Sequence, residues 1–143
     1  MGFKLKIEGL ETIDLGVKSI ETVKFITDTP KDSNARSTDL GTSVIVTGKV
    51  LAAVNGEEAD GTMKIATWSL VPAEKADCYR RLTIETIAAD QIVRKVTFPN
   101  AFVVDYTETF GDVEGVGTFY LHMKQKKDKM PDVKVEGGYE ANY

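Results

Sequence analysis

The chain has one cysteine, Cys78, and one histidine, His122, among its 143 residues. A single cysteine excludes an intramolecular disulfide and a zinc site with four cysteine ligands, and it fits a reducing compartment. A catalytic triad around His122 would need a nucleophile, and the sequence has no Gly-x-Ser-x-Gly motif to supply one. A thiolate pair of Cys78 with His122 is disfavoured, because nothing around Cys78 in the sequence would lower the pKa of its thiol.

Long apolar runs are also absent. No segment approaches the roughly 20 consecutive apolar residues that cross a bilayer, so we expect no membrane partner. Residues 1–9 lack the uninterrupted apolar segment of a cleavable signal peptide. If the protein leaves the cell, it does so through dedicated machinery.

The sequence has no excess of positive charge. Its 22 acidic and 18 basic residues leave a net charge of −4. Nucleic-acid-binding domains usually show a basic balance or a basic face, so we expect no specific nucleic-acid partner. The basic run at residues 124–129 is short and contains Asp128, and we interpret it as a solvated hairpin tip.

Loops with the spacing of a metal or phosphate site are missing as well. Residues 55–61 are acidic but lack the EF-hand spacing. Residues 111–117 are rich in glycine but match no phosphate-binding motif, and their two carboxylates would repel a phosphate. We expect no metal and no other cofactor. A small hydrolase stays open as a weak alternative, because four carboxylates lie close in sequence: Asp105, Glu108, Asp112 and Glu114.

The chain is rich instead in segments that alternate apolar and polar residues, the pattern of half-buried strands. At this length we expect a single domain over residues 1–143. Neither face of residues 17–27 is purely apolar, which suits a sheet with a core on one side and a partner surface on the other. The pattern predicts strands over residues 3–8, 17–27, 43–54, 79–87, 91–98, 102–106, 114–123 and 133–136, with a turn at 88–90 and a corner at 99–101.

One segment, residues 62–71, has helical periodicity. Met63, Ala66 and Leu70 would share one apolar face, which Ile65 and Trp68 broaden. Thr62 follows a glycine and is a possible N-cap, and Pro72 would end the helix or start a second turn. We expect Trp68 to anchor a core or an interface.

Residues 28–41 form the longest irregular stretch, with turn formers, charges and only two apolar residues, Ala35 and Leu40. Loops of more than about 12 residues inside compact domains are uncommon and are usually functional or disordered. Two interpretations stay open at this point. The segment is either a surface loop or a protruding arm that orders against a neighbouring subunit.

Two strands in the second half of the chain contain a characteristic succession of residues. The succession consists of Asn100, Ala101, Val103, Val104 and Tyr106, followed by Glu114, Val116 and Tyr120. It resembles the hemolysin-coregulated protein (Hcp) family, which forms the tube of type VI secretion systems. It is also similar to the related tail-tube proteins of contractile phages and phage-like injection machines.

The resemblance implies a mainly β fold, a β-barrel of two packed antiparallel sheets with one short flanking α-helix. It implies a structural protein rather than an enzyme, which assembles as homohexameric rings that stack into a hollow tube. Sheath, baseplate and spike proteins would be its partners, and effector cargo could travel in the lumen. The tube would assemble in the cytoplasm and be exported or extracellular after firing.

In the resembled tube proteins, the long loop after the second strand takes part in ring-to-ring stacking. Residues 28–41 occupy the matching place in the order of elements. The resemblance therefore implies a ring-stacking loop at a subunit interface, formed by Lys31, Asp32, Ser33, Asn34, Arg36 and Asp39. A monomeric β-barrel that binds a small ligand stays open as the alternative, and it would require an apolar pocket with a few polar groups.

Overall fold

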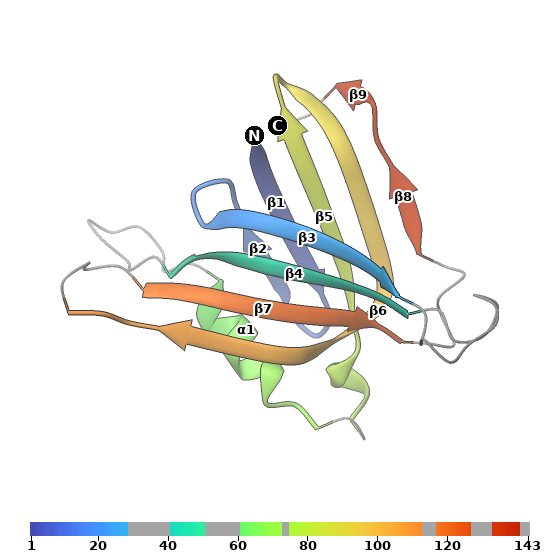
Figure 1. The fold of residues 1–143 in the computed structure, drawn as a ribbon. Coiled ribbons are helices and arrows are strands. Elements are labelled where there is room, and N and C mark those ends of the chain that lie inside the picture. The colour runs from blue at the N-terminus through green and yellow to red at the C-terminus, as the bar shows by residue number, and fades with distance from the viewer. Residues whose placement is uncertain (29–40, 51–60, 73–74, 113–116, 127–132, 141–143) are drawn as a thin grey trace.

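The computed structural model describes residues 1–28, 41–50, 61–72, 75–112, 117–126 and 133–140. These residues form nine strands, one α-helix and one 3-10 helix (Figure 1). The elements are β1 (Gly2–Glu8), β2 (Thr12–Leu15), β3 (Ile20–Asp28), β4 (Gly41–Val50), α1 (Thr62–Ser69), η1 (Ala76–Cys78), β5 (Arg80–Ala88), β6 (Gln91–Thr109), β7 (Gly117–Gln125), β8 (Lys134–Glu136) and β9 (Tyr139–Glu140).

All the described strands belong to one antiparallel sheet in the order β2-β1-β5-β6-β7-β4-β3, with β8 and β9 also paired to β6. Strand β6 has 19 residues and bends, so the sheet folds over into two layers (Figure 1). The first layer contains β2, β1, β5, residues 91–98 of β6, β8 and β9. The second layer contains residues 101–109 of β6, then β7, β4 and β3.

The expected fold class is confirmed, because the structure is mainly β with one short flanking α-helix. The two layers are halves of one bent sheet, and this sheet is not closed into a complete barrel. Its path ends at β2 on one side and at β3 on the other, and no described strand joins these two ends. β1 nevertheless packs against β3, which brings the two layers together at this side.

The bend of β6 lies at Pro99 and Asn100, where the pairing register with β5 shifts. Proline lacks the N–H of a strand ladder and is tolerated at such irregularities. The buried Gln125 supports the bend, since its side-chain oxygen accepts a hydrogen bond from the backbone N–H of Asn100 at 3.3 Å. The predicted corner at residues 99–101 is therefore a bulge within one strand, and the prediction of two separate strands there was wrong.

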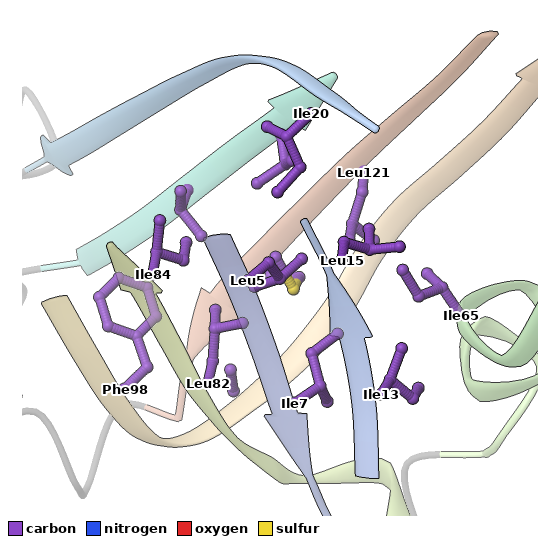
Figure 2. Close-up of a cluster of buried hydrophobic side chains, with 14 of the residues drawn as sticks. Leu5, Ile7, Ile13, Leu15, Ile20, Ile65, Leu82, Ile84, Phe98 and Leu121 are labelled. Atoms are coloured by element: carbon purple, nitrogen blue, oxygen red, sulfur yellow. The ribbon is translucent and has the colours of Figure 1, made fainter. Parts of the chain in front are cut away.

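The core fills the space between the two layers. On each strand, alternate residues point inward, as in β7, where Phe119, Leu121 and Met123 are all buried. Figure 2 shows Leu5 from the first layer, Leu121 from the second and Ile65 from α1 converging on this core. Burying one such aliphatic or aromatic side chain stabilises the fold by about 1.5–3 kcal/mol, so the alternation predicted from the sequence supplies the driving force for folding.

Several strand boundaries differ from the predictions. The predicted strand at residues 17–27 begins only at Ile20, and the four-residue β2 before it was missed, as was the two-residue β9. Strands this short contain too few alternations to be recognised in a sequence. The predicted turn at residues 88–90 is confirmed, and Ala89 and Asp90 have the positive φ angles that a two-residue hairpin turn requires.

Helix α1 forms where it was predicted, but only part of its predicted apolar face is buried. Ile65 and Trp68 are buried, whereas Met63 is 73% and Leu70 is 81% exposed. The predicted N-cap at Thr62 is also wrong, because Gly61 occupies the cap position and no side chain caps the helix. No helix among the described residues is long and apolar enough to cross a membrane.

Candidate assembly interface

Helix α1 is fixed to the sheet by Trp68. The indole Nε1–H donates a hydrogen bond to the backbone carbonyl oxygen of Cys78 at 2.9 Å. The guanidinium of Arg80 lies 5.2 Å from the centre of the indole ring and donates a hydrogen bond to the Asp77 carboxylate at 2.7 Å. A desolvated cation–π contact of this kind is worth about 2 kcal/mol. The indole therefore sets which side of α1 faces the core.

The first turn of α1 lies against the second half of β6. The Tyr106 hydroxyl is 3.4 Å from the backbone carbonyl oxygen of Thr62 and 2.5 Å from the carboxylate of Glu108. Tyr106 points toward the core side of the sheet, because it pairs with the buried Leu121 and stacks on Phe119 at 6.4 Å between ring centres. The helix therefore lies on the core side of the second layer, beside β6.

The second layer ends in two long strand edges. β3 pairs only with β4, and residues 102–109 of β6 pair only with β7 among the described strands. The last residue of β6 that pairs with β5 is Ala101, so from Phe102 onward no other described strand pairs with this edge of β6. Open edges present unpaired N–H and C=O groups and are templates for pairing with another chain.

The edges of the first layer are shorter or covered. Its outer strand β2 has only four residues, and the corresponding edge of β6 is occupied by β8 and β9. Short edge strands and covering segments are two ways in which proteins prevent edge-to-edge association. The two layers thus differ in how their edges can pair.

The open face of the first layer, which points away from the core, carries charges of alternating sign. One row across the sheet runs Lys4, Glu85, Lys95 and Glu136, and Arg81 pairs with Glu8 two rows further along the same face. Opposite charges on directly paired strands stabilise a sheet by about 0.2–1 kcal/mol per pair. Of two surface depressions in this layer, one is lined by charged and polar side chains, and the other is lined by Leu5 and Leu15 as well as by charged side chains.

The open face of the second layer has a different composition. Its rows contain the exposed lysines Lys24, Lys49 and Lys124, and the cross-strand neighbours of all three are uncharged. Threonines fill much of the remaining surface, and the hydroxyls of Thr22 and Thr47 are hydrogen-bonded across β3 and β4. The same face also carries the carboxylate of Asp105, so its charges are of both signs, but Asp105 and these lysines are not paired with one another across the strands.

The two residues considered for catalysis, Cys78 and His122, lie on separate elements, η1 and β7. Burial raises the pKa of the Cys78 thiol, and the neighbouring Asp77 carboxylate adds to the effect, so the thiolate is disfavoured. His122 lies on the open face of the second layer, paired across the strands with Asp105, as the alternation on β7 predicted.

The structure does not bring the described carboxylates Asp105 and Glu108 of the hydrolase alternative together as an acid/base pair. Glu108 is bound by the Tyr106 hydroxyl, and Asp105 faces His122 on the other side of the sheet. Glu114 lies outside the described residues. Within the described ranges, no three His, Cys, Asp or Glu side chains are grouped to hold a metal ion.

The predicted ring-stacking residues cannot be compared with the structure. Lys31, Asp32, Ser33, Asn34, Arg36 and Asp39 all lie outside the described residues, so their role stays a prediction. The residues that flank this segment are described, and Asp28 pairs with Gly41 at the end of the β3–β4 hairpin. The sequence did not identify the two open edges, since edge position depends on the order of strands in the sheet.

The bent antiparallel sheet with one flanking helix is the fold of Hcp and of chains in contractile injection systems, as the resemblance implied. Hcp1 from Flavobacterium johnsoniae has a TM-score of 0.60 at 16% sequence identity, covering 99% of this chain and 100% of that chain. A chain of the anti-feeding prophage baseplate has a TM-score of 0.56 at 11% identity, covering 95% and 93%. A chain of an extracellular contractile injection system, in its extended PVC sheath–tube complex, has a TM-score of 0.53 at 12% identity, covering 96% and 89%.

These identities are low, and the likeness is one of fold. No protein-family model and no curated protein sequence matches the chain.

Proposed function

We propose that this protein is a structural tube subunit of a contractile injection apparatus, with self-association rather than catalysis as its role. The observation that carries the proposal is the pair of long open edges on opposite sides of the second layer, at β3 and at residues 102–109 of β6. The shared fold with Hcp1 and with a chain of a sheath–tube complex supports it.

The strand directions allow these two edges to pair between copies. Each neighbouring pair in the second layer is antiparallel, so β3 and the second half of β6 run in opposite directions. When β3 of one copy lies beside β6 of the next, the junction is antiparallel as well, and the sheet continues without a change of pattern. Such a contact joins two different surfaces, and repeated contacts of this kind close into a ring when the rotation allows it.

In such a ring the open face of the second layer would line the lumen, because the core, α1 and the first layer lie on its other side. Cargo in the lumen would therefore meet threonines and lysines. The charge-paired face of the first layer would point outward, toward the sheath and baseplate. The homohexameric number, the stacking of rings through residues 31–39, the spike partner and export after firing are part of the proposal through the resemblance.

The proposal is tested by size-exclusion chromatography with light scattering, together with negative-stain microscopy of the full chain. Ring-shaped hexamers or stacked tubes are expected. A strict monomer at high protein concentration would contradict the proposal and favour the small-ligand alternative.

A further inference from the structure

Resting on the proposed function, we infer that the exposed side of α1, formed by Met63 and Leu70, packs against Phe25 of the next copy in the ring. The contact would bury these apolar side chains on the core side of the junction between β3 of one copy and β6 of the other. Met63 is 73% and Leu70 is 81% exposed in the protomer, and Phe25, although partly covered, is still 37% exposed.

Met63 and Leu70 lie on the same side of α1. They are seven residues apart, which is close to two full turns of an α-helix. The opposite side of the helix is occupied by Ile65 and Trp68, both buried, and the hydrogen bond from Trp68 to Cys78 holds the helix in this orientation. The protomer therefore presents two large apolar side chains outward on a short helix whose rotation is fixed.

The helix lies along the open edge of β6. Its first residue, Thr62, is in contact with Tyr106, and the Trp68 end is bonded to Cys78, two residues before Arg80. Arg80 pairs with Ala101, so α1 runs beside residues 101–106 of β6 (Figure 1). The exposed side of α1 is thus continuous with the strand edge that would receive the neighbouring copy.

Phe25 occupies the matching position at the other edge of the layer. It pairs with the buried Val44, so its ring points to the core side of β3. The same row continues through Met123 to Val103 on β6. Because side chains of one row share a face across a continuous sheet, Phe25 of the next copy would emerge beside β6 on the side where α1 lies.

The first experiment compares the double variant M63E/L70E with Lys64→Glu, which makes the same change of net charge at an exposed position of the same helix. The double variant should fold with an unchanged circular dichroism spectrum and lose at least about tenfold in its hexamer association constant, because it places carboxylates where apolar contacts would form. Lys64→Glu should still form rings.

The second experiment is a cross-link between copies in a Cys78→Ala background. The pair Leu70→Cys with Phe25→Cys, treated with a short bis-maleimide, should give a ladder of covalent oligomers ending at six. Each single-cysteine variant and the pair Lys64→Cys with Phe25→Cys should give no ladder.

The outcomes separate the two proposals. If the unmodified chain forms rings but M63E/L70E assembles equally well and the cysteine pair gives no ladder, the inference about α1 is wrong while the tube function stands. If the unmodified chain forms no rings at all, both are overturned.

Discussion

The two layers of this sheet share one core and differ at their margins. The first layer ends in a four-residue strand and in an edge covered by β8 and β9, and its open face pairs most of its charges with opposite ones. The second layer ends in two long edges that pair with no further strand in the part of the chain that the structure describes, and its open face carries lysines beside uncharged neighbours. The comparison teaches that long strand edges without a partner among the described strands are confined to the second layer, which is why the proposed association is placed there.

The largest expected effect tests whether buried side chains from the two layers contribute equally to the stability of the shared core. Leu82→Ala in the first layer and Leu121→Ala in the second each remove a fully buried side chain, and each should lower the free energy of unfolding by about 2–5 kcal/mol. Urea unfolding monitored by the fluorescence of Trp68 measures both. Two separate transitions in either variant would show that the layers fold as independent units and would break the comparison.

The next effect tests the open edge directly. In an antiparallel strand, the N–H groups of successive residues point to opposite edges, so of Val23→Pro and Lys24→Pro only one loses a bond to β4. That variant should be destabilised as a protomer. The other should remain folded and lose at least about tenfold in ring association, measured by light scattering.

The control for the edge test is Thr12→Pro, at the first residue of the short edge strand β2, where proline is tolerated. This variant should form rings as the unmodified chain does. Normal rings from both β3 variants, or loss of rings in the β2 variant, would refute the assignment of the interface to the second layer.

The smallest effect concerns the two open faces. Lys95→Glu would place a carboxylate between Glu85 and Glu136 and should lower stability by about 1 kcal/mol at low salt. The loss should shrink at high ionic strength, where the screening length falls to about 3 Å.

The matched change in the second layer is Lys124→Glu, whose cross-strand neighbours Ser43 and Phe102 are uncharged. Its effect on the stability of the protomer should be close to zero, within about 0.5 kcal/mol. Thermal unfolding of the two variants at low and high salt provides the measurement. Equal losses in both variants would mean that the charge rows of the first layer contribute nothing specific.

Much of the fold could be predicted from the sequence, because half-buried strands alternate apolar and polar residues with a period of two. The alternation of Phe119, Leu121 and Met123 with polar residues correctly separated the core side of β7 from its open face. The resemblance then implied the fold class that the structure has. Short elements such as β2 could not be recognised, since four residues hold too few alternations to stand out.

The helix shows where local reasoning fails. Met63 and Leu70 were predicted to share one apolar helical face that Ile65 and Trp68 broaden, yet Met63 and Leu70 point outward. The hydrogen bond and cation contact of Trp68 decide the rotation of α1, and both involve residues ten or more positions away in the chain. A local pattern identifies an apolar face but cannot say whether the same chain or another copy covers it.

By itself, the sequence determined that this chain is a β protein with alternating strands, one short helix, and little that could serve catalysis. These properties are local, because side-chain periodicity and residue types are read along the backbone. Only the tertiary structure decided that β6 bends instead of breaking, that α1 turns its apolar side outward, and that the open edges belong to one layer. Those features depend on contacts between residues distant in the chain, where the packing of the whole sheet overrides the preference of any single segment.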